Sequence, residues 1–318
     1  MKSGAMRVIT GSRLHFGPLA WKPRRGRDFG GWGVMLETPR TAVRVGHFGP
    51  DSEERGAALA SQGRAEQVLR HLAGLLPQSG EAPPQVIVDE EPPPHCGFGS
   101  GTQLALAVAA GASELAGLPR RPATEMAELV GRGLRSAVGI HGFDQGGLLV
   151  DAGKHPGDAI GALAARVEIP SGWRFVLIRP PVAEGFTGEK EAAVFECLPS
   201  FSEALSDRLS RILLTGVIPS VRQGDCPAFA EALDEYGVLV GEAFSACQGG
   251  VVHPASLPIW KLLRDRGVKG IAQTSWGPTL AVVCDSAEAA EELVQQIPPS
   301  ASVQIARPKN DGATISRL

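Results

Sequence analysis

Residues 92–110 read PPPHCGFGSGTQLALAVAA and place a glycine-rich loop directly before an apolar, alanine-rich segment. Gly97, Gly99 and Gly101 permit backbone dihedrals that other residues resist, and Ser100 and Thr102 add hydroxyl groups. A helix predicted over residues 102–118 would present its unpaired N–H groups and positive dipole end to this loop. The loop therefore predicts an anion site for phosphate or diphosphate; a tight turn with a glycine-rich helix start is the alternative.

The spacing of these glycines matches neither GxGxxG after a strand nor GxxxxGK[ST], which excludes the Rossmann and P-loop interpretations. The chain has 318 residues, a length typical of two domains. Its net charge of -3 argues against a general nucleic-acid binder, which would usually carry a basic surplus.

The cysteine pattern predicts a reducing environment. The five cysteines are odd in number and form no CxxC pair, so neither a disulfide framework nor a structural zinc site is expected. The sequence has no apolar run long enough to span a membrane and no signal-peptide core near its start. We therefore expect a cytoplasmic protein.

The first half of the chain mixes strands and helices. Strands are predicted near Val8 and over residues 41–48, 85–89 and 146–153, and helices over 52–76, 102–118 and from Thr124 towards residue 139. Pro170 and Gly172 mark the junction with the second half. This gives two domains, residues 1–168 and 169–318.

The second half has the order strand, helices, strand, strand, helix, strand. The strands are predicted over residues 173–178, 268–274, 279–284 and 301–306, and the helices over 201–214, 227–245 and 287–296. This order is the split βαβ, or ferredoxin-like, arrangement with extra helical material in the first crossover.

Five motifs in order along the chain resemble one family. Pro93-x-x-x-GFGSG resembles the second motif of the GHMP superfamily of small-molecule kinases. Together with SRLHFG (12–17), RDFGGWGVML (27–36), GRGLRSAVGIHGFDQGGLLVDAG (131–153) and QTSWGPT (273–279), it resembles the β-ribofuranosylaminobenzene 5′-phosphate synthases of tetrahydromethanopterin biosynthesis. The likeness spans nearly the full chain.

The resemblance implies the fold and the reaction. The fold would be α+β, with an N-terminal domain like the second domain of ribosomal protein S5 and a ferredoxin-like (βαββαβ) C-terminal domain. The enzyme would be a decarboxylating phosphoribosyltransferase that condenses phosphoribosyl pyrophosphate with 4-aminobenzoate and releases carbon dioxide and pyrophosphate. Mg²⁺ as cofactor and a homodimeric state are also implied.

This chemistry needs charge neutralisation at the diphosphate, alignment of two reactants and support for a transient cation. Arg13 and His15 lie two apart, so on a strand they point to one face, and we assign them catalytic roles; a strand-end pair that faces solvent is the alternative. Asp144 matches by position the acidic residue of the superfamily's S-G-x-D segment; we assign it to catalysis or metal binding, with Ser100, and a turn residue is the alternative.

The substrate-binding candidates are residues of the glycine loop, two arginines and the second-domain turn. Arg132 and Arg135, three apart on a predicted helix, would share one face; a solvated face is the alternative. Trp276 would stack on the aminobenzoate ring, or close a hairpin in the core. The full set is Gly97, Gly99, Ser100, Gly101, Thr102, Gln103, Arg132, Arg135, Gln273, Ser275 and Trp276.

Two other functions stay open at this point. The first is an ATP-dependent small-molecule kinase of the same superfamily, although QTSWGPT stands where those kinases usually carry a glycine-rich stretch. The second is a binding module without catalytic activity that kept the fold, against which Asp144, the glycine loop and Arg13 argue.

Overall fold

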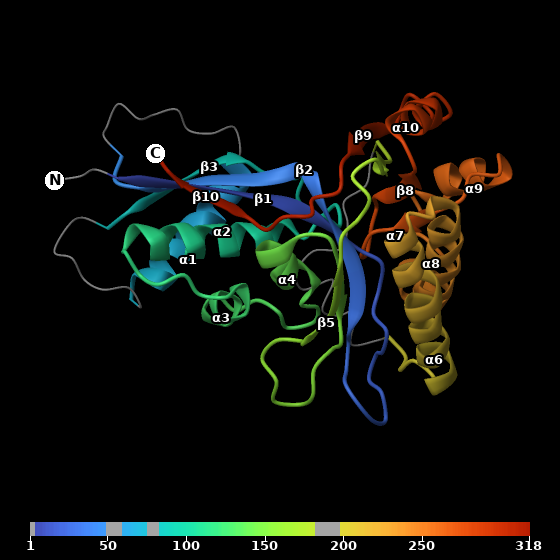
Figure 1. The fold of residues 1–318 in the computed structure, drawn as a ribbon, viewed down its shortest axis with the longest axis horizontal. Helices are drawn as coiled ribbons and strands as arrows, with labels where there is room; N and C mark the ends of the chain where they lie inside the picture. The colour runs from blue at the N-terminus through green and yellow to red at the C-terminus, as the bar shows by residue number, and fades with distance from the viewer. Residues whose placement is uncertain (1–3, 49–58, 75–82, 182–197) are drawn as a thin grey trace.

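A computed structural model describes residues 4–48, 59–74, 83–181 and 198–318. It contains two sheets, each with helices packed on it (Figure 1). A cavity lies between the two halves of the molecule. The predicted α+β class and the two-part architecture are confirmed.

The first sheet has six strands in the order β10-β1-β2-β4-β5, with β3 paired to the far half of β2. All pairings are antiparallel. The first half of β2, GWGVML, is buried, and its second half pairs with β1 on one side and with β3 on the other. The strands are β1 (Ala5–His15), β2 (Gly31–Gly46), β3 (Gln85–Glu90), β4 (Leu148–Asp151), β5 (Leu163–Val167) and β10 (Thr314–Arg317).

Four helices cover one face of this sheet (Figure 1). α2 lies centrally, and its alanines and Gly111 let it approach the strands closely: a Cβ atom at Gly111 would lie 2.9 Å from Val45 Cγ2. Its residues Leu104 to Ala112 are buried with Val8, Val43 and the other helices. The helices are α1 (Leu59–Ala73), α2 (Ser100–Leu115), α3 (Ala123–Leu129) and α4 (Val138–Gln145).

The second sheet has the order β7-β8-β6-β9, which is the ferredoxin-like order. In β6, Phe175 and Leu177 are buried on the side of α8, whereas Val176 and Ile178 are buried with α9 and α10, so both faces are covered. The elements are β6 (Arg174–Arg179), α6 (Glu203–Ile212), a π-helical segment (Leu213–Val217), α7 (Ile218–Gln223), α8 (Cys226–Gln248), α9 (Leu257–Asp265), β7 (Ile271–Gln273), β8 (Leu280–Cys284), α10 (Ala287–Val294) and β9 (Ser302–Ala306).

Trp32 joins the two domains. Its ring lies on β2 and its centroid is 4.6 Å from that of Phe16 in the first domain, and 6.0 and 5.6 Å from those of Phe229 and Tyr236 on α8. Trp32 is fully buried. A continuous core of this kind fixes α8 relative to β1, and the cavity lies between these two elements.

The structure corrects several boundaries. The predicted second domain does not extend to residue 318, because β10 pairs with β1 in the first sheet. The helix predicted from Thr124 ends at Leu129, and Arg132 and Arg135 lie in the following turn. α9 and β5 were absent from the prediction. Residues 52–58 and 75–76 of the first predicted helix lie outside the described residues.

Candidate functional site

A cavity of about 310 Å³ lies between the two domains. Its first-domain wall comes from β1, the start of α2 and the turn at residues 131–136, which we call the arginine turn. Its second-domain wall comes from α8 and the turn after β7. Three separate chain regions of the first domain and two of the second therefore meet around one space.

The N-terminus of α2 opens into this cavity. Gly99 is the N-cap, with a left-handed φ of 67°, and no side chain caps the helix. Gly99, Gly101 and Thr102 line the cavity. The free N–H groups of a first helical turn and the helix dipole favour an anion there. A Cβ atom at Gly99 would lie 2.8 Å from Arg13 Cγ, so glycine at this position leaves the room that the Arg13 side chain occupies.

Arg13 and His15 line the cavity from β1, as their alternation on the strand predicts. Arg13 Nη1 donates to the carbonyl oxygen of Gly97 at 3.0 Å. His15 is 8% exposed, and its Nε2 is buried with no hydrogen-bond partner in the described residues. Burial, and then the charge of Arg13, hold the pKa of His15 well below its usual value. His15 is therefore a neutral imidazole at neutral pH.

The arginine turn adds two further cations. A Cβ atom at Gly101 would lie 3.8 Å from Arg132 Nη1, so this guanidinium sits beside the start of α2. Arg132 Nε is buried without a hydrogen-bond partner in the described structure, and burial, followed by the charge of Arg64, lowers the pKa of Arg132. Arg135 also lines the cavity.

Acidic side chains are absent from the described residues that line the cavity. Arg13, Arg132 and Arg135 together with the N-terminus of α2 make this end strongly electropositive. An arrangement of half-buried guanidinium groups around a helix N-terminus suits a ligand with several negative charges, because each guanidinium offers a forked donor to phosphate or carboxylate.

Aromatic and aliphatic side chains line the other part of the cavity. They are Phe16, Val240, Phe244 and Trp276. The rings of Trp276 and Phe244 meet edge to face, with centroids 4.7 Å apart at 85°. Gly237 and Gly241, on the same face of α8, also line the space. This end can accept a flat apolar group of about the size of a benzene ring.

Thr274 links the two domains at the cavity and was missed by the sequence prediction. Its hydroxyl accepts a hydrogen bond from His15 N at 3.0 Å and donates to the carbonyl oxygen of Gly97 at 2.9 Å. Next to it, Ser275 N donates to the carbonyl oxygen of His15 at 2.7 Å. The motif QTSWGPT contains Thr274, but the sequence alone did not distinguish it from its neighbours.

Gln273 belongs to a closed amide network at the edge of the cavity. Its Oε1 accepts from His253 N at 2.5 Å, and its Nε2 donates to Gln248 Oε1 at 3.1 Å and to the carbonyl oxygen of Ser275 at 3.0 Å. Gln273, Ser275 and Trp276 all line the cavity. The structure thus brings the predicted second-domain residues together with Arg13 and His15.

Three predicted residues lie elsewhere. Gln103 is fully buried between β1 and α4, where it accepts from Thr10 Oγ1 at 2.6 Å and donates to the carbonyl oxygen of Gly139 at 2.7 Å. Gly97 and Ser100 do not line the cavity. Gly97 instead supplies the carbonyl oxygen that Arg13 and Thr274 share.

The structure also argues against the roles predicted for Asp144. Its Oδ2 accepts from Ala123 N at 2.8 Å, so this carboxylate satisfies the first turn of α3. Asp144 lies near the end of α4, whereas Gly139, at the start of that helix, adjoins the Arg13 side chain: a Cβ atom there would lie 3.4 Å from Arg13 Cγ. Five residues of helix separate the two positions by about 7.5 Å.

The predicted metal ligands lie on different helices, Ser100 at the start of α2 and Asp144 near the end of α4. Asp144 Oδ2 already accepts from Ala123 N. Within the described residues no group of three His, Cys, Asp or Glu side chains could hold a metal ion. A metal site at Ser100 and Asp144 therefore stays a prediction.

The chain matches the family models of both GHMP kinase domains. The family model for the N-terminal domain of GHMP kinases matches residues 64–149, and the model for their C-terminal domain matches residues 217–301. β-Ribofuranosylphenol 5′-phosphate synthase of Archaeoglobus fulgidus is 30% identical over 298 residues, covering 88% of each chain. The chain belongs to the family of the β-ribofuranosylphenol 5′-phosphate synthases, within the GHMP kinases.

Other relatives agree with this membership. The β-ribofuranosylphenol 5′-phosphate synthase of Methanothermobacter thermautotrophicus is 28% identical over 298 residues, covering 87% of this chain and 88% of its own. Homoserine kinase from Cytophaga hutchinsonii superposes with a TM-score of 0.65 at 15% identity, covering 99% and 98% of the chains, which shows the shared GHMP fold. The relatives named here are enzymes. Among the described residues, no helix is long and apolar enough to cross a membrane.

Proposed function

We propose that the protein condenses phosphoribosyl pyrophosphate with 4-aminobenzoate, releasing carbon dioxide and pyrophosphate, to form β-ribofuranosylaminobenzene 5′-phosphate in tetrahydromethanopterin biosynthesis. The observation that carries this proposal is the division of one cavity into an electropositive end and an aromatic end. The first suits a donor with phosphate and diphosphate groups, and the second suits a benzene ring.

The bonding changes balance without a protein nucleophile. The bond from the anomeric carbon to the diphosphate oxygen breaks, and the diphosphate leaves with that electron pair. The ring carbon that bears the carboxylate then bonds to the anomeric carbon, helped by electron release from the para amino group. Cleavage of the bond to the carboxylate returns an electron pair to the ring and releases carbon dioxide.

The chain's residues would act by charge and position. The start of α2, Arg13 and Arg132 would stabilise the negative charge that develops on the leaving diphosphate. Phe244 and Trp276 would hold the benzene ring of the acid against the sugar, which aligns the two reactants for bond formation. Transfer of the carboxylate from water to this apolar end favours its loss as neutral carbon dioxide.

His15 would contact the reacting groups as a neutral imidazole. Its buried Nε2 lines the same cavity as Arg13 and has no hydrogen-bond partner in the described structure. A neutral imidazole offers one hydrogen bond to a substrate oxygen without adding a charge that would repel the sugar cation. Mg²⁺ stays a proposal, and we propose that it enters bound to the diphosphate of the donor, as part of the substrate.

The names of the relatives favour a second acceptor. Those proteins are named for a ribofuranosylphenol product, which corresponds to 4-hydroxybenzoate in place of 4-aminobenzoate. The same two-ended cavity and the same bonding changes apply, since a para hydroxyl group also releases electrons to the ring. The choice between the two acceptors is therefore part of the test.

The test is an assay of the purified protein with phosphoribosyl pyrophosphate, Mg²⁺ and either acid labelled at the carboxyl carbon. Release of labelled carbon dioxide together with pyrophosphate is expected, and the ratio of kcat/KM values identifies the acceptor. Arg132→Met should lower kcat/KM at least about tenfold, since charged hydrogen bonds contribute about 1.5–3 kcal/mol. Absence of release with both acids, combined with ATP consumption on a hydroxylated metabolite, would establish the kinase alternative.

The predicted homodimer and cytoplasmic location stay predictions. Light scattering of the purified full chain measures its mass in solution directly. A mass near 33 kDa instead of twice that value would contradict the dimer.

A further inference from the structure

The arginine turn is held from outside by two charged side chains. The turn starts where Arg132 N donates to the carbonyl oxygen of Ala127 at 2.8 Å. Further along, the carbonyl oxygen of Gly133 accepts from Lys154 Nζ at 3.1 Å. Directly after the turn, Ala137 N donates to Asp151 Oδ2 at 2.6 Å. Residues 132–137 are thus fastened at three points, two of them by side chains of one short segment.

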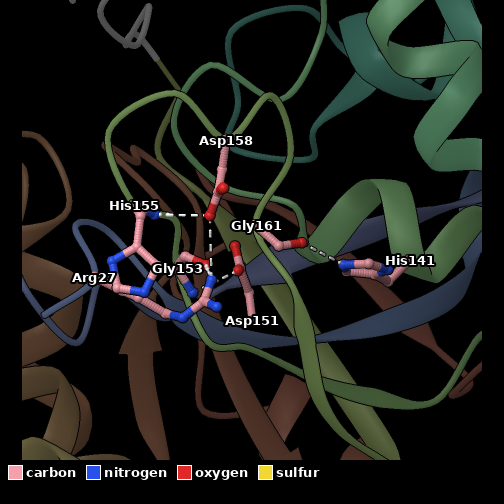
Figure 2. A network of polar contacts seen from close by, with 7 residues as sticks. All are labelled: Arg27, His141, Asp151, Gly153, His155, Asp158 and Gly161. Atoms are coloured by element: carbon pink, nitrogen blue, oxygen red, sulfur yellow. Dashed lines mark hydrogen bonds and ion pairs between the residues drawn. The ribbon is translucent and has the colours of Figure 1, made fainter.

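That segment, residues 151–154, is rigidly attached to the rest of the domain. Asp151 is fully buried at the end of β4, and its second oxygen accepts from Gly153 N at 2.8 Å (Figure 2). The main chain of Lys154 pairs with Asp28 through two hydrogen bonds of 2.9 and 3.0 Å. Arg27 Nη1 donates to the carbonyl oxygen of Gly153 at 3.1 Å (Figure 2).

The polar contacts continue outward from this segment. Arg27 also reaches Asp158 Oδ2 at 3.4 Å, and His155 N donates to the same oxygen at 2.9 Å (Figure 2). A close apolar contact adds to them: Gly133 has a left-handed φ of 88°, and a Cβ atom there would lie 2.3 Å from Ile160 Cδ1. The turn therefore rests directly on the loop that follows Lys154.

We propose that Lys154 is a positioning residue, which keeps Arg132 and Arg135 at the cavity by holding the carbonyl oxygen of Gly133 between them. The identity of the bound anion rests on the proposed function, whereas the geometry of the turn does not. Lys154 is absent from the cavity lining, so it acts through the turn. The affinity for diphosphate therefore depends on a residue that does not touch it.

Lys154→Met removes the ammonium group and keeps most of the aliphatic chain. Titration calorimetry with inorganic pyrophosphate should show binding weakened about tenfold relative to the natural protein, the size of one charged hydrogen bond. Lys154→Arg retains a donor and a charge and should restore most of the affinity. Lys22→Met, at a lysine over the Trp21 ring, removes one charge from a neighbouring loop and is the matched control, expected to change affinity less than twofold.

A double-mutant cycle with Arg132→Met distinguishes a positioning role of Lys154 from a long-range effect of its charge on the bound anion. If Lys154 acts through the arginine turn, its substitution has a smaller effect once Arg132 is absent, because only Arg135 is then left to be positioned. Equal losses in both backgrounds, or a loss equal to that of Lys22→Met, would overturn the proposal and leave the proposed function intact.

Hydrogen exchange provides a measurement that does not depend on the ligand. In Lys154→Met, amides of residues 132–137 should exchange faster than in the natural protein, while those of α2 should not change. Unchanged exchange in the turn would overturn the positioning role. Failure of the natural protein to bind pyrophosphate would instead count against the proposed function, and the exchange result would still decide the role of Lys154.

Discussion

The hydroxyl of Thr274 donates to the carbonyl oxygen of Gly97 across the domain boundary, at 2.9 Å. The same oxygen of Thr274 accepts from His15 N at 3.0 Å, and Thr274 is fully buried. One side chain of the second domain thus connects β1 to the loop before α2. The positions of His15 and of the helix N-terminus in the cavity are therefore coupled to the position of the second domain.

Thr274→Val should be among the most destabilising substitutions near the cavity. It leaves the buried N–H of His15 without its acceptor and removes one of the two donors to the carbonyl oxygen of Gly97. The expected loss in the free energy of unfolding is about 2 to 4 kcal/mol. Thr279→Val is the matched control, because the buried Thr279 hydroxyl has no hydrogen-bond partner in the described structure and its removal should be neutral or stabilising. Urea denaturation of both variants measures the difference; equal losses would contradict the linking role of Thr274.

Asp144 should matter for stability and not for turnover. Asp144→Ala removes the acceptor of Ala123 N and should cost about 1 kcal/mol, as loss of a helix cap does. Asp144→Asn keeps an acceptor oxygen, and its kcat should stay within about twofold of the natural value. A loss of 100-fold or more in the folded Asn variant would return Asp144 to the catalytic residues.

Trp276 should affect the aromatic acid and not the sugar donor. Trp276→Leu removes the edge-to-face contact with Phe244 and the flat surface at the apolar end, so KM for the acid should rise by about five- to tenfold. KM for phosphoribosyl pyrophosphate should change less than about twofold.

Trp21→Leu controls for lost packing in that experiment. Trp21 is also buried, and its Nε1 donates to the carbonyl oxygen of Leu198 away from the cavity lining. Its substitution should lower the unfolding temperature without changing KM for the acid. If Trp276→Leu instead raised KM equally for the aromatic acid and for phosphoribosyl pyrophosphate, the benzene ring of the acid would not stack on Trp276.

The buried His15 predicts a loss of stability in mild acid. Because its pKa is lowered in the folded state, the unfolded chain binds a proton first as the pH falls below about 6.5. Folded-state stability should therefore fall between pH 6.5 and the lowered pKa, by up to about 1.4 kcal/mol per pH unit from this group. Urea denaturation at several pH values should show a smaller slope for His15→Gln; an unchanged slope would assign the acid sensitivity to other groups.

The part of the site that depends on local pattern could be predicted from the sequence. Arg13 and His15 share a face because side chains alternate on a strand, and Gly99 ends up before a helix because the apolar run after it is long. The ferredoxin-like order also follows from the sequence of elements, since it needs only the type and order of each segment.

The rest depends on contacts between distant segments. Gln103 lies in the predicted motif, but its partners Thr10 and Gly139 turn it into a core residue. Arg132 reaches the cavity from a turn because α3 ends early, and Lys154 rather than a helix holds that turn. The motif predicts a site role for Asp144, whereas Gly139, at the other end of α4, is the residue that lies beside Arg13.

The pairing of β10 with β1 has a consequence for how the enzyme is made. On the ribosome, the strand that carries Arg13 and His15 emerges early, but its outer neighbour in the sheet emerges only with residues 314–317. Until then β1 exposes unpaired main-chain groups along one edge, a surface on which nascent chains can associate wrongly. Slow translation or a chaperone that shields this edge would therefore affect the yield of active protein more than its final stability.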